Sequence, residues 1–149
     1  MKNQDPGGYI AITREKFDAG AHIEAAKRRT TGAIVTFVGV VRDDAIESIE
    51  IEAYEEVAET DLYEIRDEAV AKYDLQEVTI VHRTGKLRVG EDILLIVVSA
   101  GHRKQAFSGC EYILERIKER APIWKREILP DGDRWVKGNY EKNDRFRVL

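Results

Sequence analysis

A run of branched aliphatic residues constrains the fold of this chain more than any other feature. Residues 93–100 read ILLIVVSA, a strand's length of side chains that favour a sheet. The run predicts a buried strand. A helix that crosses a bilayer needs about 20 apolar residues, so the run does not indicate a membrane span. We therefore expect a sheet that buries this strand.

Other segments have the residue pattern of strands. In ESIEIEAYEE, Ile49, Ile51 and Ala53 alternate with acidic residues, which predicts a strand with one wet face. The segment KLRVGE (86–91) is expected to be turn material between two strands. The predicted strands lie within YIAIT (9–13), GAIVTFVGVVRD (32–43), ESIEIEAYEE (47–56), EVTIVHRTG (77–85), DILLIVVSA (92–100) and IWKREIL (123–129).

Three segments are predicted to be helical. Asp18 is a candidate N-cap for a helix through AGAHIEAAKRR (19–29). The second helix is indicated by apolar residues at helical spacing, namely Ala58, Leu62, Ile65 and Ala69. The third spans residues 102–120 and ends at Pro122, because proline cannot continue the hydrogen-bond ladder. Its apolar stripe is formed by Ala106, Cys110, Ile113 and Ile117.

This order of elements is strand, helix, two strands, helix, two strands, helix, strand. It predicts an α+β sandwich in which helices pack on a mixed or antiparallel sheet. With 149 residues, the chain is long enough for one well-buried core and too short to make two domains the expectation. We expect a single domain over residues 1–149, with flexible ends at residues 1–7 and about 138–149.

Charge and cysteine content narrow the class of protein. The formal net charge of -4 gives no general attraction to nucleic acid or to a membrane surface. A single cysteine excludes an intrachain disulfide and suits a reducing compartment. No signal peptide is recognisable at the N-terminus. We therefore expect a cytoplasmic protein that binds neither nucleic acid nor a membrane.

Lys118 is the first candidate for chemistry. Each helical residue turns by about 100°, so Lys118 falls close in angle to Leu114 and Phe107, at the edge of the buried stripe. A lysine at such an edge either extends its stem along the core with its amine in solvent or faces a pocket. The spacing leaves both readings open.

Further cations lie where elements begin or end. His102 and Arg103 open the third helix, where free N–H groups favour an anion, although His102 can equally make a local cap. Arg42 follows a buried strand, a position from which residues reach ligands, but taken alone it is a solvated loop arginine.

Lys125 and Arg126 point to opposite faces if their segment is extended, so only one of them can enter a given pocket by side-chain direction. Strand alternation does not decide which one. If Lys118 and Lys125 converge, each raises the cost of charging the other, and the pKa of both amines falls. A neutral amine then becomes available as a nucleophile or base.

Other chemistries are not indicated. The three histidines lack the spacing of metal ligands, and no glycine-rich phosphate loop is present. We expect no metal and no cofactor. Cys110 lies on the apolar stripe of its helix, which favours packing over reactivity.

An ordered set of segments resembles the large, catalytic subunit of molybdopterin synthase, the MoaE family. The resemblance runs from about Tyr9 to Val136. Its blocks are GAIVTFVGVVRD, EAYEEVAETDL, VTIVHRTGKLRVGE, SAGHRKQAF, ERIKERAPIWKRE and DGDRWV. The ordered set is specific, although no single block would suffice.

The resemblance implies an α/β hammerhead-type fold and sulfur transfer in molybdenum cofactor biosynthesis. The family converts cyclic pyranopterin monophosphate to molybdopterin. Its sulfur donor is a ubiquitin-like small subunit whose C-terminal Gly-Gly tail ends in a thiocarboxylate. The large subunits form a homodimer within a heterotetramer. Such a donor suits a chain whose one cysteine is expected to be packed in the core.

The resemblance also implies roles for residues at matching positions. Lys118 and Lys125 match the two active-site lysines, Lys118 as the amine nearest the thiocarboxylate and Lys125 as the group that binds or polarises the pterin. Arg42, His102 and Arg103 match anion-binding and catalytic positions. The positions that line or support the site are Phe37, Leu114 and Arg126.

Two other classes of function remain open on the residues alone. A non-catalytic phosphometabolite-binding module would use the same cations without turnover, and its affinity would depend steeply on salt. A purely structural dimerisation domain would tolerate Lys118→Ala. The lysine pair beside a helix-breaking proline favours the enzyme.

Overall fold

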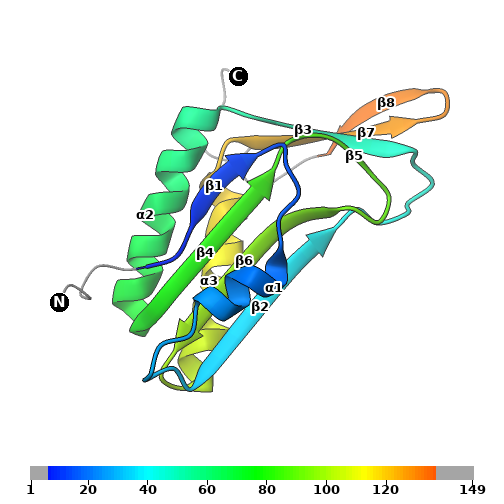
Figure 1. Ribbon diagram of the computed structural model, residues 1–149. Coiled ribbons are helices and arrows are strands. Elements are labelled where there is room, and N and C mark those ends of the chain that lie inside the picture. The colour runs from blue at the N-terminus through cyan, green and yellow to red at the C-terminus, as the bar shows by residue number, and fades with distance from the viewer. Residues whose placement is uncertain (1–6, 137–149) are drawn as a thin grey trace.

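The computed structural model describes residues 7–136, which form two sheets and three helices (Figure 1). The helices are α1 (Ala19–Ala25), α2 (Glu55–Tyr73) and α3 (Arg103–Arg120). The strands are β1 (Ile10–Thr13), β2 (Ala33–Val40), β3 (Ser48–Ala53), β4 (Leu75–Arg83), β5 (Gly85–Arg88), β6 (Asp92–Ala100), β7 (Ile123–Leu129) and β8 (Gly132–Val136).

The first sheet has the strand order β1-β4-β6-β2 and carries helices on both faces. β1 runs parallel to β4, whereas β4 and β2 run antiparallel to β6, so the sheet is mixed. Side chains of β6 alternate between two cores. Ile96 and Val98 belong to the larger core with α2 and α3, and Leu95 and Val97 pack under α1. The run at residues 93–100 is thus buried because both faces of its sheet are covered.

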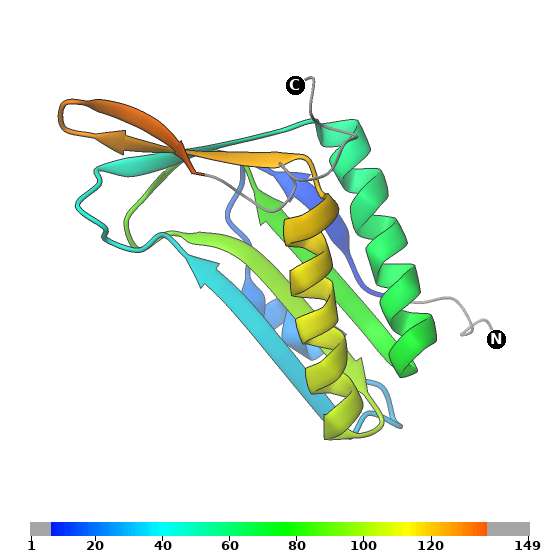
Figure 2. The same ribbon diagram turned by 180° about the vertical axis from the view of Figure 1, so that it is seen from behind.

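The second sheet has the order β5-β3-β7-β8 and is antiparallel throughout. It lies beyond the ends of α2 and α3, where α3 leads directly into β7 (Figure 2). Ile49 and Ile51 of β3 belong to the larger core, whereas Glu52 of the same strand is exposed. One hydrophobic core therefore connects the two sheets.

Ion pairs fix the C-terminal turn of α3 against α2. Arg120 donates to Glu68 at 2.7 Å and to Glu64 at 3.0 Å. The predicted stripe of α3 is buried along its length, with Ala106 and Ile113 fully inaccessible. The turn that carries Lys118 is therefore held in place by packing on one side and by charge pairing on the other.

The structure confirms the α+β fold class and the helices packed on a mixed sheet. It also confirms the cap at Asp18, whose Oδ1 accepts from the N–H of Ala21 at 3.1 Å. The first helix, however, ends at Ala25 and not at Arg29. Arg28 instead donates to Glu77 of β4 at 2.7 Å, so a tertiary contact replaces the last predicted turn.

Two strands were not predicted. β5 lies within the segment expected to be a turn, and it begins at Gly85, which has a φ of +94° that favours glycine. β8 follows a turn at residues 130–131 and pairs with β7. Gly7, expected in a flexible start, forms a bridge with Glu77. The other residues of the two ends expected to be flexible lie outside the described part of the chain.

Polar side chains are buried where β4 ends. His82 is 4% exposed, and its Nδ1 lies 3.0 Å from the carbonyl oxygen of Arg83. The Arg83 guanidinium donates to Glu91 and to the backbone oxygens of Asp92 and Arg14. Burial, together with the nearby charge of Lys125, lowers the pKa of His82 from 6.5 to about 4. The buried polar side chains at this end of β4 are therefore connected by hydrogen bonds.

Within residues 7–136, the structure contains no helix that is long and apolar enough to cross a bilayer.

Ile113→Ala tests the packing of α3. Ile113 is fully inaccessible between α3 and the first sheet, so we expect the substitution to lower the free energy of unfolding by about 2–5 kcal/mol. Glu111→Ala, at an exposed position of the same helix, should change it by no more than about 0.5 kcal/mol. Urea unfolding measures both, and equal losses would contradict the assigned burial.

His82 should make stability depend on pH. Between pH 6.5 and 4 the unfolded chain binds a proton at His82 that the folded chain does not, so stability falls as the pH falls. The His82 contribution is about 2–3 kcal/mol between pH 7 and 4.5. Urea unfolding at both pH values should show a larger acid-induced loss for the wild type than for His82→Gln. Identical losses would show that His82 titrates normally.

Candidate active site

Strand β7 directs Lys125 inward and Arg126 outward. Lys125 pairs in register with Ile51, which is 1% exposed, and it shares a face of β7 with the buried Ile123. Arg126 pairs with Glu50 on the opposite face. Strand alternation alone does not decide whether Lys125 or Arg126 faces inward. The core decides it, because the face of the sheet that carries Ile51 and Ile123 is the buried one, and Lys125 lies on that face.

Lys118 stands in the last turn of α3 and acts on Lys125 through its charge. Burial, followed by the positive charge of Lys118, lowers the pKa of Lys125 below its usual value. Lys118 itself is exposed. The structure thus brings one lysine from a helix and one from the following strand to the same place, with the more buried amine made easier to deprotonate.

A cleft of about 270 Å³ opens beside Lys125. Its walls come from the ends of β2 and β6, the loop after β2, and strands β3, β7 and β8. They are formed by Val40, Val41, Arg42, Asp44, Ile46, Ile49, Ile93, Lys125, Glu127 and Val136. Six of the ten lining residues are aliphatic, and the remaining four are two cations, Arg42 and Lys125, and two carboxylates, Asp44 and Glu127. The cleft therefore combines an apolar surface with a few polar groups, as ligand sites do.

Arg42 reaches the cleft from the segment that follows β2. Its side chain is 83% exposed, and its Nε donates to Asp44 at 3.0 Å. An ion pair this exposed contributes little to stability. Exchange of Asp44 for a phosphate or carboxylate of a ligand would therefore cost little.

His102 and Arg103 lie far from this cleft. His102 is the N-cap residue of α3 and makes no side-chain cap bond, and both residues are exposed. Sixteen residues of helix separate His102 from Lys118, which at 1.5 Å per residue is about 24 Å. Within one copy of the chain these two cations cannot act on the group that Lys118 contacts.

Phe37 and Leu114 do not line the cleft. Both are half-buried and pack against the larger core. Leu114 lies one turn before Lys118 on α3, so the two side chains share a face of that helix. Exposed Phe107 extends the same side of α3 toward solvent.

Arg126 is engaged on the outer face of the second sheet. Its guanidinium donates to Glu50 at 2.7 Å and to Asp133 at 3.4 Å, and it lies 5.4 Å from the ring centre of Trp135. The structure places it behind β7 and outside the cleft that Lys125 lines.

Sequence reasoning predicted two of the ten cleft residues, Arg42 and Lys125. The eight that it missed are Val40, Val41, Asp44, Ile46, Ile49, Ile93, Glu127 and Val136. Glu127 is two residues after Lys125 and on the same face of β7, so alternation would have found it once the inward face was known. It accepts from Arg134 at 2.6 Å. Val136 belongs to the strand that was not predicted, and no local signal indicated it.

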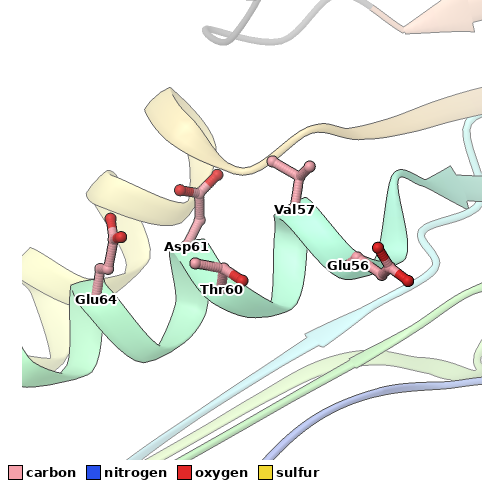
Figure 3. Close-up of a pocket in the computed structure, with 5 residues that line it drawn as sticks. All are labelled: Glu56, Val57, Thr60, Asp61 and Glu64. Carbon is pink, nitrogen blue, oxygen red and sulfur yellow. The ribbon is translucent and has the colours of Figure 1, made fainter.

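A second, larger cavity lies along α2. It measures about 520 Å³ and is lined by Glu56, Val57, Thr60, Asp61 and Glu64 (Figure 3). Three carboxylates would oppose an anionic substrate there. None of the residues proposed for chemistry lines it, so size alone is a poor guide to the site in this protein.

No group of three or more His, Cys, Asp or Glu side chains is arranged to hold a metal ion within residues 7–136. Cys110 is buried in α3, and burial raises the pKa of its thiol to about 11. The reading of Cys110 as a packing residue agrees with this.

The chain is similar to molybdopterin synthase subunits along most of its length. The family model described as MoaE protein matches residues 12–120. The molybdopterin synthase catalytic subunit of Pyrococcus abyssi is 40% identical over 129 residues, which are 84% of this chain and 87% of the relative. The catalytic subunit of Escherichia coli K12 is 42% identical over 133 residues, 86% of this chain and 89% of the relative.

Solved structures of molybdopterin synthase proteins are also similar to this chain. The crystal structure of molybdopterin synthase from Staphylococcus aureus has a TM-score of 0.82 at 39% identity and covers 86% of this chain and 96% of its own. A protein–protein complex of subunits 1 and 2 of the molybdopterin-converting factor from Helicobacter pylori has a TM-score of 0.70 at 25% identity, over 88% of this chain and 89% of its own. This chain belongs to the MoaE family, to which the molybdopterin synthase catalytic subunits belong.

Proposed function

We propose that this chain is the sulfur-transferring subunit that converts cyclic pyranopterin monophosphate to molybdopterin in molybdenum cofactor biosynthesis. The observation that carries the proposal is that Lys125 lines a cleft and feels the charge of Lys118, in a chain of the MoaE family. Burial, followed by the positive charge of Lys118, lowers the pKa of Lys125, which provides an amine that is more readily neutral than an ordinary lysine.

The two lysines take different roles in this proposal. Lys118 is exposed at the end of α3, where an incoming peptide tail can reach it. It serves as the amine nearest the thiocarboxylate and as a proton-transfer group or transient acyl acceptor. Lys125 is more buried and lines the cleft, so it binds or polarises the pterin. In this proposal Phe37 and Leu114 support the site from the larger core.

The substrate phosphate needs cations, and Arg42 supplies one at the cleft. His102 and Arg103 are about 24 Å along α3 from Lys118. They can bind the same substrate only if a second copy of the chain brings them to it, which fits a homodimer within a heterotetramer.

Arg126 holds Glu50 and Asp133 on the back of β7, so its role is to brace the strand that carries Lys125.

The sulfur must come from a partner. Cys110 is the one cysteine of the chain, and its buried thiol has a pKa of about 11, so it is a poor nucleophile at neutral pH. A ubiquitin-like small subunit with a C-terminal Gly-Gly thiocarboxylate supplies the sulfur in this proposal. The Helicobacter pylori complex of two converting-factor subunits supports a two-subunit assembly.

The same proposal treats residues 1–149 as one catalytic domain acting in the cytoplasm. The core shared by the two sheets supports the single domain. The single cysteine suits a reducing compartment.

The alternative is a module that binds a phosphometabolite without turnover. The exposed Arg42 and the apolar cleft would serve it equally well. The catalytic subunits among the relatives favour chemistry. The lowered pKa of Lys125 agrees with them, because a pure anion-binding site gains nothing from an amine that loses its charge easily.

Single-turnover kinetics test the roles of the lysines. With a thiocarboxylated small subunit and cyclic pyranopterin monophosphate, we expect Lys118→Ala and Lys125→Ala to lower the rate by at least about tenfold, or ~1.4 kcal/mol of transition-state stabilisation. Lys27 is an exposed lysine that pairs with Glu24, so the control variant Lys27→Ala should react like the wild type. Folded wild type that binds both partners and forms no product would refute the enzyme and favour the binding module.

Acetylation of the lysines as a function of pH tests their electrostatic coupling. Lys125 should reach half-maximal reactivity at a lower pH than Lys27, as read by peptide mass spectrometry. Lys118→Met removes one positive neighbour, so the midpoint for Lys125 should rise toward 10.5 without reaching it, because burial still disfavours the charged form. An unchanged midpoint would mean that the two amines do not interact.

A further inference from the structure

The cleft beside Lys125 contains an ion pair between two of its own lining residues. Arg42 and Asp44 both line the cleft, and Nε of Arg42 donates to Oδ2 of Asp44 at 3.0 Å. The other carboxylate of the lining, Glu127, accepts instead from Arg134, which does not line the cleft. Asp44 is therefore the carboxylate that occupies a cation of the cleft itself.

The segment that carries Asp44 is held at both ends by backbone hydrogen bonds. The N–H of Val41 donates to the carbonyl oxygen of Glu91 at 2.9 Å, and the N–H of Glu47 donates to that of Ile128 at 2.8 Å. The few residues between these two bonds have little freedom to carry the Asp44 carboxylate away from the cleft.

A left-handed turn directly follows Asp44. Ala45 has a φ of +63°, a region that residues with a Cβ adopt rarely, and its N–H donates to Oδ1 of Asp43 at 3.1 Å. Asp43 thus stabilises the turn, and it does not line the cleft. Two neighbouring aspartates therefore have different places in the structure, one in the turn and one at the cleft.

Asp44 and an anionic ligand would compete for the same guanidinium. Arginine binds carboxylates and phosphates through the same fork of N–H groups. Arg42 is 83% exposed and Asp44 is 43% exposed, so burial does not prevent an exchange of partners. The Asp44 carboxylate would also repel a phosphate placed beside Arg42. Both effects lower the affinity of the cleft for an anion.

We propose that Asp44 is a displaceable internal ligand of Arg42, which holds the guanidinium at the empty cleft and gives way to the anionic group of the substrate. A small anion then gains one ion pair and breaks another, so it binds weakly. A ligand with an apolar body also contacts the aliphatic lining, and this contact retains it. The inference rests on the proposed function for the identity of the ligand, but not for the exchange at Arg42.

Two variants separate displacement of Asp44 from a general effect of charge. Asp44→Asn removes the carboxylate charge and keeps the size of the side chain. Asp43→Asn is the matched control, because it removes the same charge one residue away and its amide oxygen can still accept from Ala45. Both positions are exposed, so both variants should fold, which thermal unfolding checks. Asp44→Ala serves as a second variant if Asp44→Asn is unstable.

The first measurement is an NMR titration with inorganic phosphate, which needs neither pterin nor partner. The amide signals of residues 41–46 report on the cleft, and Arg42→Ala should abolish their response to phosphate. Asp44→Asn should bind phosphate about three- to fivefold more tightly than the wild type, and this gain should shrink in high salt. Asp43→Asn should stay within about twofold of the wild type.

Three results would overturn the proposal. Equal affinities in the wild type and Asp44→Asn would mean that Asp44 does not compete. Weaker binding by Asp44→Asn would mean that Asp44 orients Arg42 for the anion. Equal gains in Asp43→Asn and Asp44→Asn would mean that only the net charge of the segment matters.

The second measurement is calorimetric binding of cyclic pyranopterin monophosphate. Without phosphate, Asp44→Asn should bind the pterin more tightly than the wild type by the factor found for phosphate. At saturating phosphate the two affinities should become equal, because phosphate then occupies Arg42 in both proteins. An advantage that persists at saturating phosphate would contradict displacement. If the wild type does not bind the pterin at all, the proposed function fails, and the phosphate titration still decides the role of Asp44.

Discussion

The burial of β6 on both faces is the constraint on which the rest of this structure depends. A strand made of Ile93 to Ala100 cannot leave either face in water at low cost, so α2 and α3 must cover one side and α1 the other. Once α3 lies along the sheet, its C-terminal turn ends at the second sheet. Pro122 then stops the helix and sends β7 back across that turn. The candidate site follows from this geometry, since Lys118 lies in the last turn of the helix and Lys125 lies in the strand that follows.

Like charges close to each other are unfavourable, and Lys118 and Lys125 have different surroundings in the fold. Lys118 remains in solvent, where its charge is hydrated at little cost, and the neighbouring Arg120 is neutralised by Glu64 and Glu68. Lys125 is partly withdrawn from water, so the repulsion falls on its protonation equilibrium. Burial and the repulsion between the two amines both disfavour the charged form of Lys125, so they lower its pKa. In the proposed chemistry, that is the property a sulfur-transfer site uses.

The remaining cations predicted for the site do not gather at one place within a single copy of the chain. Arg42 reaches the cleft, whereas Arg126 is held behind β7 by Glu50 and Asp133. His102 and Arg103 lie at the far end of α3. A resemblance in sequence groups all of these residues as one site, but a helix about 25 Å long separates the ends from which they act. Assembly of two copies resolves the discrepancy in the proposed function.

The sequence by itself determined the strand at residues 93–100, the buried stripe of α3, the cap at Asp18 and the stop at Pro122, because each depends on side chains that are close in the chain. It did not determine β5 or β8. β5 depends on a positive φ at Gly85 and on pairing with β3, and β8 depends on pairing with β7. Nor could it choose between Lys125 and Arg126, since alternation fixes only that they face opposite ways. That choice, and the place of Glu127 in the lining of the cleft, were decided by which face of the second sheet joins the core. Burial is a property of the whole fold, so only the tertiary structure could settle it.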